Sequence, residues 1–296
     1  MNAKKTKLTT PLALTLDVDP DANRAIAGRV DCVSAGFNAR ITLAAARKGL
    51  HALHRLLLSL RLPATAFWEA RTLNALAKTD PALITQLAEN TALEHACHGL
   101  RHEDLTAHLS KCPMSRQEKI DRIVRATDII TGIMGTRPAG FRAPYCRVDR
   151  TDLDILSELG YSYDASGTFD AFQAFSKGSS ESSPDAGLAK GIREIPMLLW
   201  RDAGGKPISG YLWQLLEGRR TPGEYIDMVE EIGEKHPGRL IQLALHPWHL
   251  AVKEDGQPVE DTARAADAVR MLLESLPRRA RVCFTTIEGY LERRIR

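Results

Sequence analysis

The chain has 296 residues, 44% hydrophobic and 26% charged, and its 40 basic and 37 acidic side chains give a formal net charge of +3. This composition is typical of a folded globular protein and excludes disordered, collagen-like and coiled-coil classes. The two signs of charge are interspersed, so no basic face predicts nucleic-acid binding. No apolar run approaches the roughly 18 residues of a membrane span. We therefore expect a small molecule or a neutral polymer as ligand, with neither nucleic acid nor a membrane as partner.

The cysteines and the N-terminus predict a cytoplasmic protein. The five cysteines are scattered and form no Cys-x-x-Cys pair, which favours free thiols in a reducing compartment. They are Cys32, Cys97, Cys112, Cys146 and Cys283. Near the N-terminus an apolar run reaches Asp17 after about six residues, whereas a secretory signal needs roughly 7–15.

Short β-prone runs alternate with helical patterns along the chain, which indicates a mostly parallel sheet or barrel. We expect strands over 12–16, 64–68, 93–97, 139–142, 161–164, 193–198, 240–245 and 282–285. The predicted fold class is α/β. We expect a flexible tail over residues 1–10 and a single catalytic barrel domain over 11–296, with a mobile loop near 177–187, where Gly, Ser and Pro are frequent.

Helix signals stand between the strands. Residues 41–60 have Ala and Leu at helical spacing, and Asp80-Pro81 is typical of a helix start. Ser115 and Glu118 form the pattern of a capping box, and the helix they open should end at Gly135. We expect one apolar face on this helix, formed by Ile120, Ile123, Val124, Ile130 and Ile133. A further helix should end at Gly160.

Uncommon polar residues follow several of the predicted strands. Because the carboxyl ends of barrel strands share one mouth, which carries the active site, we expect these residues to converge although some lie about 230 positions apart. They are Asp17 and Asp19 after the first strand, His98 and His102 after the third, Arg142 at the fourth and His246 after the seventh.

Each of these features also has a plainer interpretation. The Asp17-Val-Asp19-Pro-Asp21 segment is compatible with an ordinary turn. A calcium loop fits poorly, because Ala22 and Gly28 stand where an EF-hand needs Gly and Glu.

The histidines support chemistry more strongly in combination than singly. His98 and His102 are four residues apart, which would place both on one side of a helical turn and suit capture of one metal ion, although exposed histidines give the same pattern. Gly99 lowers helix propensity, so a loop that enters a helix is the alternative for this segment. His246 ends an apolar strand and is either an acid–base group or a satisfied core histidine. Taken with the carboxylates and Arg142, they predict a hydrolytic metal site.

The motifs, in this order, resemble those of the polysaccharide deacetylase family, carbohydrate esterase family four. The resemblance covers the chain from Leu14 to about Glu288. The five segments that carry it are 15–19 (TLDVD), 98–102 (HGLRH), 140–145 (GFRAPY), 245–246 (LH) and 284–288 (FTTIE).

The resemblance implies a distorted barrel of about seven strands and a divalent metal, usually Zn²⁺, with Co²⁺, Ni²⁺ or Mn²⁺ as alternatives. It implies Asp19, His98 and His102 as the metal ligands. The implied catalytic groups are Asp17 as base, Arg142 orienting it, His246 as acid and the backbone N–H of Tyr145 on the substrate oxygen. Pro144, Leu245 and Trp248 stand beside these residues and are candidate substrate contacts. With metal-activated water supplied, Cys97 and Cys146 are not expected to be nucleophiles.

The implied reaction is hydrolysis of a non-peptide C–N bond, with N-deacetylation of an amino sugar or polysaccharide-derived substrate as the first hypothesis. Val18 separates the two aspartates, a variant that resembles the intracellular branch with allantoinase-like and cyclic imide hydrolases, so a cyclic amide or ureide is the alternative. A non-catalytic glycan- or metal-binding relative is the third hypothesis. The fourth family motif is not assigned, and with it the residue that supports His246. An apolar group around Trp213 fits either a homo-oligomer contact or a substrate groove.

Overall fold

Strand β1 (Thr10–Val18) is the central strand of a parallel sheet. In the computed structural model, which describes residues 9–31, 42–171, 191–253 and 255–295, nearly every residue of this strand is buried. Its run of apolar residues is typical of a parallel strand covered on both faces. The sheet order is β10 (Ile241–Leu245), β1, β2 (Ala64–Trp68), β3 (Leu93–Cys97), β4 (Gly140–Phe141), β5 (Tyr163–Asp164) and β7 (Arg193–Glu194), and β11 (Val282–Phe284) pairs with the start of β1.

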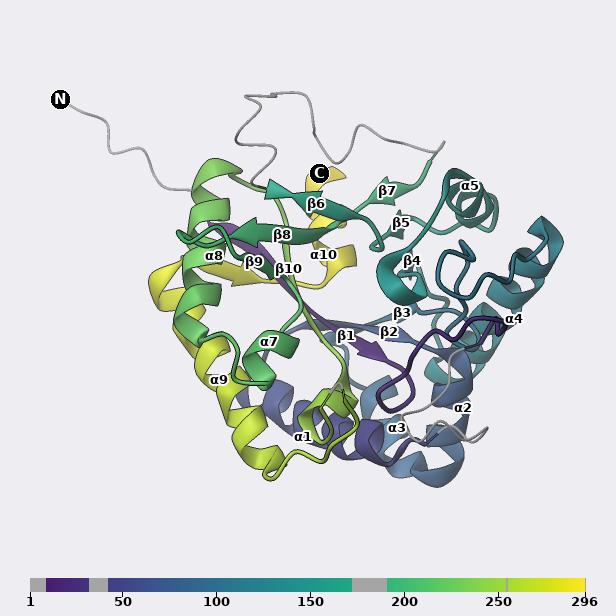
Figure 1. Cartoon of the computed structure of the whole chain (residues 1–296), viewed down its shortest axis with the longest axis horizontal. Helices are drawn as coiled ribbons and strands as arrows, with labels where there is room; N and C mark the ends of the chain where they lie inside the picture. The colour runs from purple at the N-terminus through teal and green to yellow at the C-terminus, as the bar shows by residue number, and fades with distance from the viewer. Residues whose placement is uncertain (1–8, 32–41, 172–190, 254, 296) are drawn as a thin grey trace.

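All of these pairings are parallel, and the sheet curls into the half-barrel expected from the sequence. Figure 1 shows helices around the outside of the sheet, with β1 crossing its middle. The helices are α1 (Ala44–Leu60), α2 (Ala70–Thr79), α3 (Pro81–Ala88), α4 (Arg116–Met134), α5 (Arg150–Glu158), α7 (Trp213–Leu216), α8 (Pro222–Lys235), α9 (Thr262–Arg279) and α10 (Ile287–Ile295). No helix of the described residues is long and apolar enough to cross a lipid bilayer.

The predicted helix starts of α3 and α4 are confirmed by capping hydrogen bonds. Asp80 accepts from the N–H of Leu83 at the start of α3, and Ser115 and Glu118 form the reciprocal capping box of α4. Gly135 ends α4 in a left-handed conformation, as expected. Val124 is a correction: its side chain is 39% exposed, so it does not belong to the buried face of this helix.

The predicted strand 193–198 is wrong in one respect, because the chain leaves the main sheet in the middle of it. Pro196 has no N–H to donate, and β8 (Met197–Arg201) instead pairs with β6 (Thr168–Asp170) and β9 (Pro207–Ser209) in a second, three-stranded sheet. Strand β1 begins at Thr10, the last residue of the expected tail, and residues 1–8 of that tail lie outside the described residues. The expected loop near 177–187 lies outside the described residues, and the single catalytic domain stays a prediction.

Strands β4 and β5 approach each other closely where Gly140 pairs with Tyr163. Tyr163 is fully buried, and its hydroxyl donates to Glu94. A Cβ atom added at Gly140 would lie 1.8 Å from Cζ of Tyr163, so this position has no room for a side chain. The small residue therefore lets the tyrosine fill the space between the strands.

We predict that Gly140→Ala lowers the free energy of unfolding by about 3 kcal/mol or more, because the added methyl group displaces a buried aromatic ring in a close-packed interior. Urea denaturation measures this change. The matched control is Gly132→Ala in α4, where an added Cβ meets nothing within 4 Å. That change should stabilise the helix by about 0.5–1 kcal/mol. Equal effects of the two substitutions would contradict the packing argument.

Candidate active site

The polar residues predicted from strand ends meet at one mouth of the sheet. Asp17 lies near the end of β1 and Asp19 just beyond it, His98 follows β3, Arg142 follows β4 and His246 follows β10. Both aspartates and Arg142 are fully buried, whereas 22% of the His246 side chain is exposed. The structure thus brings together residues from four strands in a place that is largely closed to water.

Asp19, His98 and His102 form the group of side chains suited to hold a metal ion. One ligand atom from each lies within 4.8 Å of the others, and all three residues are buried. Oδ2 of Asp19 is 3.1 Å from Nε2 of His102 and 3.9 Å from Nε2 of His98. One carboxylate and two imidazoles is a donor set that divalent transition metals accept.

The protonation states also fit a cation. Nδ1 of His98 lies 2.7 Å from the carbonyl oxygen of Arg142, which can only accept, so Nδ1 carries the proton and Nε2 presents a lone pair. Burial lowers the pKa values of His98 and His102 to about 4, which favours the neutral, ligating form. Burial likewise raises the pKa of Asp19 to about 6, a cost that a bound cation would offset.

The segment from His98 to His102, the histidine turn, is a bend in a loop, as Gly99 suggests, and not the helical turn that the spacing alone predicts. Gly99 has a φ of 80° and His102 a φ of 55°. Buried Glu103 holds the turn, since its carboxylate accepts the N–H groups of Leu100 at 3.1 Å and Arg101 at 3.0 Å. The turn, rather than helical periodicity, brings both imidazoles to Asp19.

Arg142 lies inside the half-barrel and donates four hydrogen bonds from its guanidinium. Nη1 donates to Oδ1 of Asp17 at 2.5 Å and to Thr15 at 3.0 Å, and Nη2 donates to Oε1 of Gln242 at 2.5 Å. Nε donates to a backbone carbonyl at 3.2 Å, and the guanidinium lies 4.1 Å from the ring centroid of Phe67. These contacts come from several strands and fix the position of the group.

The same contacts keep Asp17 ionised. Burial alone would raise the pKa of Asp17, but the Arg142 charge and the nearby imidazoles lower this pKa well below its ordinary value. Arg142 stays charged, because the attraction of Asp17 outweighs burial and raises its own pKa. The mouth therefore holds a carboxylate that is a proton acceptor at neutral pH.

Three further residues at this mouth were missed by the sequence analysis. Nδ2 of Asn23 donates to Oδ2 of Asp19 at 2.6 Å. The hydroxyl of Tyr211 donates to Oδ2 of Asp17 at 2.5 Å, and its ring stacks on His246. Glu103 holds the histidine turn. Asn23 and Glu103 adjoin the recognised motifs and could have been included on that ground, whereas no sequence signal marks Tyr211.

A cavity of about 310 Å³ opens in front of these groups. It is lined by Asp17, Ala22, Asn23, His98, His102, Tyr145, Cys146, Tyr211, Trp213, His246, Trp248 and His249. Among these lining residues there is no lysine or arginine, and aromatic rings form much of the wall. Tyr145, with a φ of 59°, and Trp248 line this cavity, whereas Pro144 and Leu245, the two other expected substrate contacts, are buried and are not among the lining residues.

Trp248 has a second role beside the cavity. Its Nε1 donates to Oδ1 of Asp19 at 2.9 Å, so the same indole forms part of the wall and orients a proposed metal ligand.

Burial raises the pKa of Cys97 to about 12 and that of Cys146 to about 11, which keeps both thiols protonated. This agrees with the expectation that neither cysteine is a nucleophile.

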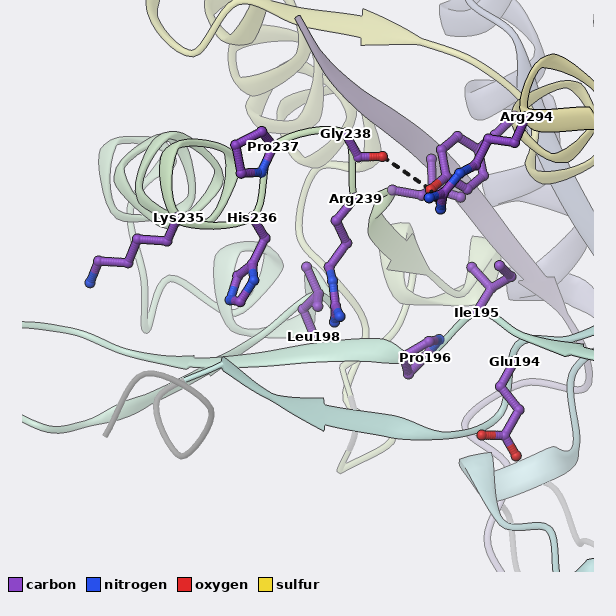
Figure 2. Close-up of a pocket in the computed structure, with 12 residues that line it drawn as sticks. Glu194, Ile195, Pro196, Leu198, Lys235, His236, Pro237, Gly238, Arg239 and Arg294 are labelled. Atoms are coloured by element: carbon purple, nitrogen blue, oxygen red, sulfur yellow. Dashed lines mark hydrogen bonds between the residues drawn. The ribbon is translucent and has the colours of Figure 1, made fainter. Parts of the chain in front are cut away.

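Another cavity, of about 320 Å³, lies at the amino end of β10, away from this mouth. Figure 2 shows Lys235, His236 and Arg239 on its wall, with Glu194 on the strand side. The metal-ligand group found among the described residues is not part of it. The chemistry of the chain is therefore centred on the carboxyl ends of the strands.

Comparison with known proteins agrees with this arrangement. A family model described as polysaccharide deacetylase matches residues 40–163, which include His98, His102, Arg142 and Tyr145. The peptidoglycan deacetylase-like protein FGM2 of Gibberella zeae is 34% identical over 84 residues, which are 28% of this chain and 23% of that protein. The match thus spans about a quarter of this curated relative.

Two solved structures share the fold over nearly the whole length. A Mycobacterium smegmatis protein assigned as a polysaccharide deacetylase superposes with a TM-score of 0.62 at 17% identity, covering 98% of this chain and 92% of that one. PuuE allantoinase superposes with a TM-score of 0.59 at 15% identity, covering 97% and 91%. At these identities the likeness shows the fold alone. The family model matches residues 40–163, which is less than half of the chain, so this segment is similar to polysaccharide deacetylases and the solved structures show a shared fold.

Proposed function

We propose that this chain is a divalent-metal-dependent hydrolase that removes the acetyl group from an N-acetylated amino sugar or sugar-derived substrate. The observation that carries the proposal is the buried Asp19–His98–His102 group, which lies beside the ionised Asp17–Arg142 pair and faces an open cavity. The family match adds the reaction class. An uncharged acetamide suits a cavity whose described lining residues include no lysine or arginine.

The side chains divide the work of amide hydrolysis between them. A divalent ion held by Asp19, His98 and His102 would polarise the amide carbonyl and activate a water molecule. Asp17, held by Arg142, would accept the proton of the attacking water at its carboxylate. Zinc is the metal that the family resemblance favours, and the donor set suits it.

We assign to His246 the supply of a proton to the leaving nitrogen. Its Nε2 is 4.0 Å from Oδ2 of Asp17 and 3.6 Å from Oδ2 of Asp19, so it lies beside the reacting groups without replacing either. Tyr145 lies on the cavity wall in a left-handed backbone conformation. We assign its N–H to the oxygen of the scissile amide, where a fixed backbone donor stabilises developing negative charge.

A cyclic amide or ureide is the second candidate substrate, with the same groups in the same roles. Two observations favour it. Val18 separates Asp17 from Asp19, and the cavity of about 310 Å³ is at the small end of ligand sites, which commonly reach about 300–1,000 Å³. A single ring between aromatic walls would fill this space, whereas a polymer would extend beyond it.

We predict that His98→Ala removes bound divalent metal, because it deletes one of three protein ligands. Elemental analysis of the purified protein after incubation with Zn²⁺ and dialysis measures the stoichiometry. The matched control is His51→Ala, since His51 lies on α1, with its side chain 42% exposed and Nε2 2.7 Å from Asp80. This variant should keep one equivalent of metal. Full metal retention by the His98 variant would contradict the proposed site.

Asp17→Asn should leave the metal in place and lower kcat by about 10²–10⁴-fold, the usual contribution of a general base. The substitution keeps the shape of the side chain but removes its ability to take a proton. Steady-state kinetics and elemental analysis are measured on the same preparation, with circular dichroism to verify folding, because Arg142 loses its buried counter-charge. Near-normal kcat, or loss of the metal, would show that Asp17 has another role.

The substrate class is decided by a panel of N-acetylated mono- and oligosaccharides, cyclic imides and allantoin, assayed with zinc-loaded and cobalt-loaded protein. We expect acetate release from the sugars. Ring-opened product from a cyclic amide, without acetate release, would transfer the assignment to the second candidate. Turnover of neither class by metal-loaded protein would refute both and favour a binding role for the metal site.

A further inference from the structure

Tyr211 contacts both of the side chains that we assign to proton transfer. Its hydroxyl donates to Oδ2 of Asp17 at 2.5 Å. Its ring lies nearly parallel to the imidazole of His246, with centroids 5.5 Å apart and an interplanar angle of 12°. Tyr211 therefore links a residue that follows β10 with a residue at the end of β1.

The backbone around Tyr211 is fixed against β10. The N–H of Ala244 donates to the carbonyl of Gly210 at 2.9 Å, and the N–H of Leu212 donates to the carbonyl of Ala244 at 2.8 Å. A Cβ atom at Gly210 would lie 2.4 Å from the carbonyl oxygen of Gln242, so the close approach depends on glycine. The hydroxyl of Tyr225 donates to the carbonyl of Tyr211 at 2.8 Å. This segment is thus a rigid support and brings Tyr211 beside His246.

The two oxygens of Asp17 are held by different donors. Arg142 occupies Oδ1 and Tyr211 occupies Oδ2, so rotation of the carboxylate would break a hydrogen bond to a buried charge on either side. His246 needs support of another kind, because its Nε2 is 4.0 Å from Asp17, beyond hydrogen-bond distance. The rings of Tyr211 and Trp248 stack on its imidazole instead.

We propose that Tyr211 is a positioning residue that holds Asp17 with its hydroxyl and His246 with its ring, in the orientation needed for proton transfer. This inference rests on the proposed function, since it takes Asp17 and His246 as the base and the acid. It assigns the support of His246 that the sequence left open.

Two substitutions separate the hydroxyl from the ring. Tyr211→Phe removes the hydrogen bond to Asp17 and keeps the ring, and should lower kcat about ten- to hundredfold, as expected for loss of a hydrogen bond to a charged group. KM and metal content should change little, because the variant keeps the cavity wall and the metal ligands. Tyr211→Leu also removes the stacked ring and should lower kcat further.

The matched control is Tyr290→Phe, which removes a hydroxyl that donates at 3.0 Å to the carbonyl of Gly238 in the cavity at the amino end of β10. It should lower Tm slightly and leave kcat unchanged. If Tyr211→Phe keeps wild-type kcat, or loses kcat only in proportion to a loss of Tm shared with the control, Tyr211 is not a positioning residue.

A readout without turnover keeps this result separate from the proposed function. In NMR spectra of protein with labelled histidine, ring-current shifts from a stacked tyrosine should move the Cε1–H resonance of His246. Tyr211→Phe should preserve that resonance position and Tyr211→Leu should change it. An exchange-protected hydroxyl proton should disappear in Tyr211→Phe and shift in Asp17→Asn. If no substrate is turned over, the proposed function fails. The positioning role is overturned separately if the His246 resonance stays in place in Tyr211→Leu and the protected hydroxyl proton persists in Tyr211→Phe.

Discussion

The buried pair of Arg142 and Asp17 is the interaction on which the mouth of this half-barrel depends. Both groups are fully buried, and the transfer of a guanidinium and a carboxylate out of water costs several kcal/mol per ion unless each is well hydrogen-bonded. Here the compensation is extensive, since Thr15, Gln242 and a backbone carbonyl accept hydrogen bonds from three further N–H groups of Arg142. A change of register in β1 or β10 would leave a charge unpaired in the interior, so this pair ties the strands to one another as well as orienting Asp17.

The alternation of side chains along β1 also explains the position of Asp19, one of the proposed metal ligands. Side chains in a strand alternate between faces, so Asp17 and Asp19 share one face and Val18 points to the other. Val18 is accordingly fully buried in the hydrophobic core. The intervening valine therefore has a structural reason: it packs β1 against the core while both carboxylates face the mouth. Asp19, just past the end of β1, reaches the two histidines, while Asp17 remains at Arg142.

The sequence predicted the site residues that follow strand ends. It did not predict the features of the site whose position depends on tertiary contacts. Asp17, Asp19, His98, His102, Arg142 and His246 were found because parallel strands bring their carboxyl ends to one mouth. The spacing of the two histidines predicts a helical turn and Gly99 favours a loop, but neither reveals the left-handed backbone at Gly99 and His102 that Glu103 stabilises. Tyr211 was missed because its position depends on the pairing of an irregular segment with β10, which no periodicity records. Pro196, in contrast, was a visible reason to divide the predicted strand.

The aromatic residues of the cavity differ in how far they are free to vary. Trp248 lines the wall, stacks on His246 and donates to Asp19, so a change there alters the proposed metal site together with the substrate wall. Tyr211 is constrained in the same way through Asp17. Trp213 lies at the start of the short helix α7, which supplies none of the proposed ligands or proton-transfer groups. Substitutions in α7 can therefore alter the proposed substrate wall without changing the proposed ligands or proton-transfer groups. Trp248 and Tyr211 are less free to vary, because each donates a hydrogen bond to a buried aspartate of the site.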